Sequence, residues 1–141
     1  MYWRIGEILI REKLLNWAEL EDVLRTQKIT SRKTGEILLE KRYISESLLY
    51  QALAKQHEIK YVDLKKVRVD ENVSDLIPKS IAKKYRIFPL QSFRKKLIMA
   101  VADPSDDWPR HEIASLAQAD QVECVVATPS DIEEAVETYC N

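Results

Sequence analysis

Apolar residues in the first part of the chain recur at helical spacing, and the pattern occurs twice. From Leu20 to Leu24 they lie three and four positions apart, which is the spacing of one helix face. The same stripe returns 29 positions later, from Leu49 to Leu53. Asn16 and Ser45, which precede the two stripes, are residue types that cap helix N-termini. Each copy therefore predicts two short helices.

Beyond residue 58 the helical periodicity gives way to short β-branched runs separated by prolines. The expected elements are short helices over 73–78 and 79–86, strands over 86–93 and 95–103, a helix over 106–120, a strand over 121–128 and a helix over 129–140. Thr128 or Ser130 is the expected cap of the last helix. The predicted fold class is α+β: a four-helix tandem-repeat subdomain over 1–57, followed by a small α/β subdomain with about three strands over 58–141.

Glycine is scarce, and its two occurrences fall at the same position of the repeat. A chain of 141 residues with average usage would hold about ten glycines. This chain has only Gly6 and Gly35, each followed by Glu-Ile-Leu. The position indicates a backbone requirement that is used twice. One interpretation is that the backbone approaches a ligand closely; the other, compatible with it, is that the glycines are tight helix–helix contacts or turn residues.

Composition and charge narrow the classes of function. The net charge of −1 disfavours a broad nucleic-acid interface but permits a local cationic pocket for a small anionic ligand. The apolar runs are far too short to span a bilayer, and no signal peptide is recognisable at the start. We expect a cytoplasmic segment with no direct membrane insertion.

Residues for catalysis are sparse. His57 and His111 each stand alone, without a second metal ligand at a familiar spacing. Two glycines cannot form a Gly-rich phosphate loop. Cys124 is expected to be a small buried hydrophobe in a strand and Cys140 a terminal thiol. We therefore expect no enzymatic activity, metal or cofactor in this segment.

Several stretches together carry a family resemblance. They are "RIGEILIREKLL", "KTGEILLEKRYI", "VDL", "IPKSIAKKYRIFPL" and "MAVADPSD". These stretches resemble the MshEN family, the N-terminal domain of type II secretion and type IV pilus ATPases. Residues 4–27 and 33–56 each match a 24-residue motif of that family, with a five-residue spacer between them. In the family the paired motifs bind the bacterial second messenger cyclic di-GMP.

The resemblance implies a non-enzymatic cyclic di-GMP receptor module that regulates a larger bacterial protein. The host would be a secretion or pilus ATPase or a glycosyltransferase-like protein, acting in a secretion, pilus or polysaccharide machine at the inner-membrane face. The ligand has two similar halves, so a duplicated motif offers one half-site to each. The ligand-binding positions implied by the resemblance are Arg4, Ile5, Gly6, Leu9, Leu14, Leu24 and Gln27 in the first motif, Lys33, Thr34, Gly35, Leu38, Tyr43, Leu53 and Gln56 in the second, and Asp103 beyond them.

The chemistry of these residue types suits the ligand. The guanidinium of Arg4 can donate two hydrogen bonds to one guanine or stack on its ring. The glutamines offer a hydrogen-bond donor and an acceptor from one amide. The leucines provide an apolar surface that can contact the faces of the purine rings. The carboxylate of Asp103 can accept from guanine N1–H and N2–H together. Each residue also has an ordinary role: surface charge, core packing, exposed helix position or, for Asp103, a turn.

Several positions depart from the family pattern. Lys13 and Arg42 replace a second glycine, and the second copy begins Lys33-Thr34 instead of Arg-Leu. Lys13 and Arg42 either compensate with charge or reflect the loss of a left-handed helix end. The departures favour an alternative function: a protein-docking domain with a degenerate ligand site that seats a secretion ATPase on its inner-membrane partner. The net charge disfavours a third possibility, a helix-turn-helix nucleic-acid binder.

Overall fold

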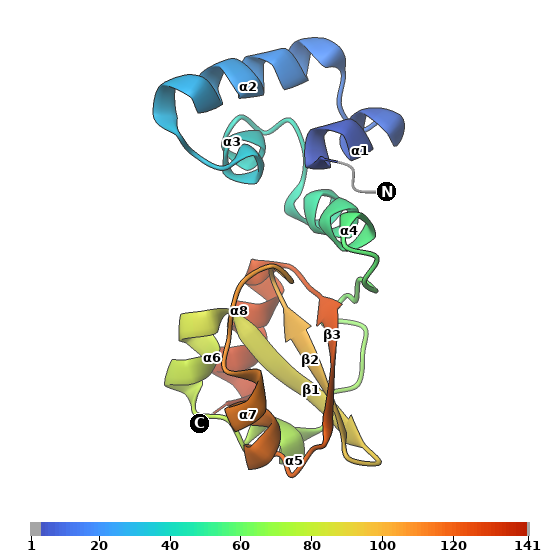
Figure 1. Cartoon of the computed structure of the whole chain (residues 1–141), viewed down its shortest axis with the longest axis vertical. Helices are drawn as coiled ribbons and strands as arrows, with labels where there is room; N and C mark the ends of the chain where they lie inside the picture. The colour runs from blue at the N-terminus through green and yellow to red at the C-terminus, as the bar shows by residue number, and fades with distance from the viewer. Residues whose placement is uncertain (1–3, 141) are drawn as a thin grey trace. The chain divides into compact units, whose positions relative to one another are not determined.

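The chain divides into two compact units, Met1–Glu58 and Ile59–Asn141. The computed structural model describes residues 4–140 of them (Figure 1). Within that range it contains eight helices and a three-stranded sheet. The fold is α+β, as predicted.

The first unit consists of two helix pairs, one from each copy of the repeat. Its helices are α1 (Ile5–Arg11), α2 (Trp17–Thr30), α3 (Thr34–Glu40) and α4 (Glu46–Gln56). Helix α1 packs against α4, and α2 packs against α3. Each copy therefore contacts the other copy through both of its helices.

Both predicted caps of the long helices are confirmed. Asn16 accepts a hydrogen bond from the backbone N–H of Glu19 at 2.8 Å, and the Glu19 carboxylate accepts from the Asn16 N–H at 3.1 Å. These two bonds form a complete capping box at the start of α2. At the start of α4, Ser45 Oγ accepts from the N–H of Leu48 at 3.3 Å.

The two glycines lie where helices meet. A Cβ atom at Gly6 would lie 2.8 Å from Cδ1 of Leu20, and one at Gly35 would lie 3.3 Å from Cδ2 of Leu49. Neither glycine has a positive φ, so turn geometry does not require them. The repeated glycine therefore permits a close approach between the two helices of each copy, which is the second of the two interpretations above.

The short helices α1 and α3 end in the same way. Lys13 and Arg42 have φ of 61° and 59°, in the left-handed region. The N–H of Leu14 donates to the carbonyl of Leu9 at 2.9 Å, and the N–H of Tyr43 donates to that of Leu38 at 3.1 Å. This six-to-one bond is the Schellman arrangement that glycine usually supplies. The left-handed helix end is therefore kept at both positions without glycine.

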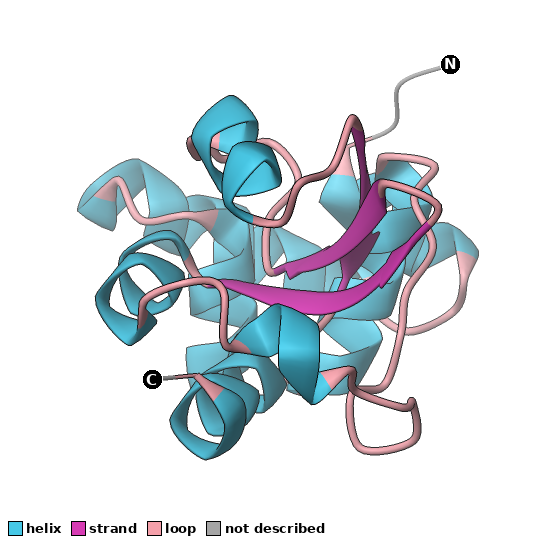
Figure 2. Ribbon diagram, turned by 90° about the horizontal axis from the view of Figure 1, so that it is seen from below, coloured by secondary structure: helices cyan, strands magenta, loops and turns pink. Residues whose placement is uncertain are grey.

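The second unit contains α5 (Glu71–Ser74), α6 (Lys79–Tyr85), β1 (Ile87–Phe93), β2 (Lys96–Val101), α7 (Arg110–Leu116), β3 (Gln121–Val126) and α8 (Pro129–Tyr139). The strands form one sheet (Figure 2). Their order is β1-β2-β3, with β1 antiparallel and β3 parallel to β2. Helix α7 supplies the crossover that a parallel pair requires. Tyr61 adds a parallel bridge to Val126 at the outer edge of β3.

The core of this unit covers both faces of the sheet at one end. The four residues Ile87–Leu90 at the start of β1 are all buried, although neighbouring side chains point to opposite faces. Helices α6 and α8 contact this strand, and the rings of Phe88 and Tyr139 lie 6.0 Å apart. At the other end of β1, Phe93 is 69% exposed.

Three details in the second unit refine the sequence prediction. Helix α7 begins at Arg110 instead of 106, because Pro109 disfavours helical geometry in the residue before it. Of the two proposed caps for α8, Thr128 is the one used, since its Oγ1 accepts from the N–H of Asp131 at 3.2 Å. Cys124, expected to be buried, is only half-buried, and the thiol of Cys140 is buried.

Candidate functional site

Arg4 and Lys33 occupy equivalent places at the starts of the two short helices. They are the N-cap residues of α1 and α3, with φ and ψ of −67° and 150° for Arg4 and −68° and 145° for Lys33. Both side chains are exposed, and neither forms a capping hydrogen bond. By contrast, Asn16 and Ser45 cap α2 and α4. The repeat therefore presents two exposed cations beside helix starts that no side chain caps.

The residues predicted to bind the ligand differ in accessibility. Arg4, Leu24 and Lys33 are exposed, Ile5, Leu14, Gln27, Thr34, Gly35, Tyr43, Leu53, Gln56 and Asp103 are half-buried, and Gly6, Leu9 and Leu38 are buried. Leu9 and Leu38 are 0% exposed because their side chains lie inside the core of the helical unit. In this structure these two leucines pack in the core beneath the exposed site residues, and they have no accessible surface for a ligand.

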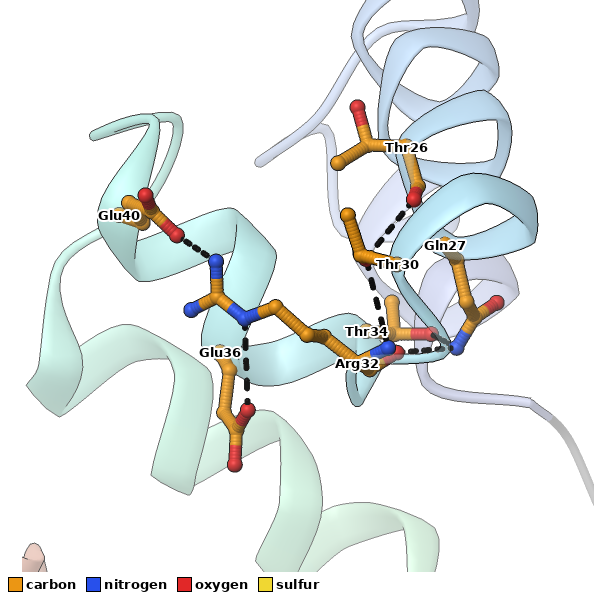
Figure 3. Close-up of polar contacts among 7 residues, drawn as sticks. All are labelled: Thr26, Gln27, Thr30, Arg32, Thr34, Glu36 and Glu40. Carbon is orange, nitrogen blue, oxygen red and sulfur yellow. Dashed lines mark hydrogen bonds and ion pairs between the residues drawn. The ribbon is translucent and has the colours of Figure 1, made fainter.

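Two predicted site residues meet where the first motif ends and the second begins. Gln27, the last residue of the first motif, lies in α2, and Thr34 is the first residue of α3. The Nε2 of Gln27 donates to Thr34 Oγ1 at 3.0 Å and to the backbone carbonyl of Arg32 at 3.1 Å (Figure 3). The short spacer brings these polar groups together.

Tyr43 is held by residues that the sequence does not single out. Its hydroxyl donates to Oδ2 of Asp22, and Lys41 Nζ lies 2.8 Å from the same oxygen. The hydrogen bonds from Lys41 and Tyr43 lower the pKa of Asp22, and the bond to Asp22 raises the pKa of Tyr43. The counterparts of Asp22 and Lys41 in the other copy are Gln51 and Glu12, so comparison of the repeats carries no signal for this cluster.

Asp103 forms a turn in the second unit. Its Oδ1 accepts from the backbone N–H of Ser105 at 2.9 Å and from the Ser105 hydroxyl at 2.6 Å. The Asp103 carbonyl accepts from the N–H of Asp106 at 3.1 Å. The ordinary role of a turn residue is therefore present, and it occupies one of the two carboxylate oxygens.

Between residues 4 and 140, no three His, Cys, Asp or Glu side chains are grouped so that they could hold a metal ion. In the same part of the chain, no helix combines the length and apolar character needed to cross a membrane.

Comparison with known proteins identifies relatives of both units. The family model described as MshEN domain matches residues 57–141. The type IV pilus assembly ATPase PilB of Myxococcus xanthus (strain DK1622) is 32% identical over 139 residues. That alignment covers 99% of this chain but 24% of PilB, so the chain spans about a quarter of its relative.

Solved structures cover both units as well. The structure of MshE with cdg (cyclic di-GMP) matches with a TM-score of 0.78 and 29% identity, over 97% of this chain and 99% of that one. The N-terminal domain of XpsE matches with a TM-score of 0.68 and 19% identity over the full length of both chains. The likeness to XpsE shows a shared fold. The helical repeat lies outside the family-model match, and the PilB and MshE comparisons extend over it.

Proposed function

The chain belongs to the MshEN domain family, and we propose that it is a non-enzymatic module that binds cyclic di-GMP through its helical repeat. The module would pass the level of the messenger to a host protein of the secretion or pilus ATPase class. Through such a host it would act at the cytoplasmic face of the inner membrane.

One observation carries the proposal: the likeness to MshE with cdg extends over 97% of the chain at 29% identity. It therefore includes both copies of the repeat, not only the second unit. PilB supports the proposed class of host, because its similarity covers 99% of the chain.

The geometry of the repeat suits a ligand with two similar anionic halves. Arg4 and Lys33 stand at equivalent positions, both exposed, and can attract the two phosphates. Only Arg4 can also fork onto a guanine or stack on it. The half-buried Leu14 and Tyr43, which follow the two left-handed helix ends, would provide apolar surface for the bases.

The docking-only alternative loses part of its support. It relied on departures from the family pattern, including Lys13 and Arg42. Both residues retain the left-handed conformation that glycine would provide, so these substitutions leave the backbone of the repeat intact. The replacement of Arg-Leu by Lys33-Thr34 remains a chemical change at the second half-site.

Calorimetric titration of the purified chain with cyclic di-GMP tests the proposal, with cyclic di-AMP as the control ligand. We expect selective binding with a Kd of about 1 μM or lower, which corresponds to about −8 kcal/mol or better. The protein should also leave cyclic di-GMP intact during prolonged incubation. If neither heat nor chemical-shift change accompanies titration at high protein concentration, the receptor function is refuted and docking remains.

A further inference from the structure

The side-chain amide of Gln27 is held in one orientation by the start of the second motif. We propose that Thr34 is a positioning residue for cyclic di-GMP: it binds the amino group of Gln27 and thereby presents the carbonyl oxygen Oε1 to a hydrogen-bond donor of the ligand. The inference rests on the receptor function proposed above. It assigns a role to a residue that departs from the family pattern.

The hydrogen bonds determine which end of the amide is engaged. Gln27 Nε2 lies 3.0 Å from Thr34 Oγ1 and 3.1 Å from the carbonyl oxygen of Arg32. A backbone carbonyl only accepts hydrogen bonds, so the amide atom facing it must be the NH2 group. These two bonds use both amino hydrogens. Oε1 is then the group left for a ligand, and Figure 3 shows it on the side away from Thr34 and Arg32.

Backbone geometry in the spacer places the Arg32 carbonyl. Ser31 ends α2 in the left-handed conformation, with φ of 58°, and its N–H donates to the carbonyl of Gln27 at 2.8 Å. The Thr30 hydroxyl donates to the carbonyl of Thr26 at 2.8 Å and accepts from the N–H of Arg32 at 3.4 Å. The chain is thus turned tightly between α2 and α3, and the carbonyl of Arg32 meets the Gln27 side chain.

The side chain of Arg32 adds a second restraint on the spacer. Its guanidinium pairs with the carboxylate of Glu40 and lies 3.8 Å from that of Glu36 (Figure 3). Both acids belong to α3. The residue that supplies the carbonyl is therefore tied to the same helix that supplies the Thr34 hydroxyl.

The first motif lacks this device. With the 29-residue offset, Gln27 corresponds to Gln56 and Thr34 corresponds to Ile5. An isoleucine side chain cannot accept a hydrogen bond, so it cannot orient an amide in this way. The substitution of Thr for an aliphatic residue therefore gives the two glutamines different restraints. Gln27 is thereby prepared to accept, through a hydroxyl that Ile5 does not have.

An oriented acceptor has a consequence for recognition. A free amide can rotate to offer either its donor or its acceptor, whereas Gln27 offers the acceptor without paying the entropy of ordering. Such an acceptor matches the N1–H of guanine and is mismatched at the same position of adenine, where N1 is itself an acceptor. Thr34 would thus contribute to both affinity and base selectivity through Gln27, without touching the ligand.

The test compares Thr34→Val, which keeps the shape but removes the hydroxyl, with Thr34→Ser, which retains it. Calorimetry should show about a fivefold loss of cyclic di-GMP affinity for Thr34→Val, or about 1 kcal/mol. Thr34→Ser should bind within about twofold of the unchanged chain. In a Gln27→Met background, the Thr34→Val change should have no further effect on affinity, because the group that Thr34 positions is gone.

Side-chain amide resonances provide a second readout, which does not depend on the measured affinity. Gln27→Met identifies the two Nε2 proton signals by their loss. In the free protein, Thr34→Val should shift one of these protons, and adding cyclic di-GMP to the unchanged chain should leave both engaged with their present partners. Urea unfolding of each variant separates a loss of affinity from a loss of fold.

The possible failures are distinguishable. If the unchanged chain gives no heat with cyclic di-GMP, the receptor function itself fails. If the unchanged chain binds and Thr34→Val binds equally well, only the positioning role is overturned. Displacement of the Nε2 proton signals by the ligand would likewise overturn it, because Gln27 would then be acting as a donor.

Discussion

The hydroxyl of Tyr43 donates a hydrogen bond to the carboxylate of Asp22, which joins the turn after α3 to α2. Lys41 lies 2.8 Å from the same carboxylate oxygen. Three residues from the two copies of the repeat are thereby connected at one point. Because Tyr43 is also a proposed ligand-binding residue, this cluster links the stability of the repeat to its proposed site.

The Asp22 cluster predicts a pH dependence of stability. The pKa of Asp22 is lowered from its ordinary value of 3.8, chiefly by the hydrogen bond from Lys41. Its stabilising contribution is therefore complete above pH 3.8 and is lost as the pH falls through the lower pKa of the folded state. Asp22→Asn should destabilise the protein at pH 7. Urea unfolding should show that the difference from the unchanged chain shrinks toward pH 3.

Tyr43 predicts a second pH dependence of stability, at alkaline pH. The pKa of Tyr43 is raised above 10.0 because its hydroxyl donates to Asp22. The contribution of this bond is present below pH 10 and is lost as the pH rises through the higher pKa of the folded state. Tyr43→Phe should remove this alkaline limb and leave the Lys41 contact in place. An identical alkaline profile for Tyr43→Phe and the unchanged chain would contradict the assignment.

The two half-sites should contribute unequally to binding. Arg4 can both stack and fork onto a base, whereas Lys33 is a point charge on a flexible stem. Arg4→Ala should therefore cost more cyclic di-GMP affinity than Lys33→Ala. The Lys33 effect should diminish more steeply with added salt, because screened attraction is most of what it supplies. Lys33→Arg should leave the affinity equal or improve it by up to about tenfold. Calorimetry at two salt concentrations measures the cyclic di-GMP affinity of all three variants. If Arg4→Ala binds as well as the unchanged chain while Lys33→Ala does not bind, the stronger half-site is the one at Lys33.

The left-handed helix ends are sites where glycine should stabilise the protein. Lys13 and Arg42 have φ near 60°, a conformation that costs an L-residue about 1 kcal/mol relative to glycine. Lys13→Gly and Arg42→Gly should each raise the free energy of unfolding by about 0.5–1 kcal/mol. Lys28→Gly is the control: Lys28 is an exposed residue within α2, where glycine should destabilise by about 1 kcal/mol. Destabilisation by all three would show that the Lys13 and Arg42 side chains contribute more than their backbone strain costs.

The repeated glycines predict a graded response to alanine. An added Cβ at Gly6 would lie 2.8 Å from Leu20, whose side chain is 6% exposed and confined by the core, whereas at Gly35 the nearest atom is 3.3 Å away. Alanine also gains about 1 kcal/mol of helix propensity over glycine. Gly35→Ala should thus be near neutral, and Gly6→Ala should be less stable than it by about 1 kcal/mol or more. Thermal and urea unfolding of the two variants provide the comparison. Equal stability would mean that Leu20 moves aside freely.

The structural features that arise from interactions between residues close in the chain could be predicted from the sequence. The capping box of Asn16 and Glu19 involves residues three apart, so its chemistry is visible in the linear pattern. The same is true of the apolar stripes of α2 and α4. The two strands around Arg94 and Lys95 were also predictable, because short β-branched runs flank a charged turn.

The candidate site was predicted in its positions but not in its contacts. The 29-residue offset paired Arg4 with Lys33, and the structure shows the same N-cap geometry at both. It did not reveal that Asp22 would bind Tyr43, because the two are 21 residues apart and nothing in their spacing links them. Nor could it distinguish Leu38, which is buried, from Leu24, which is exposed.

By itself, the sequence determined the repeat, its helix starts and the order of strands and helices, since these follow from periodicity and capping between residues close in the chain. Only the tertiary structure decided why Gly6 is glycine, how Lys13 ends its helix and which end of the Gln27 amide remains open. Each of those outcomes depends on an atom brought near by packing or by a turn: Cδ1 of Leu20, the carbonyl of Leu9, and the carbonyl of Arg32. Distances of about 3 Å between such groups arise when the chain folds, and residue spacing does not encode them.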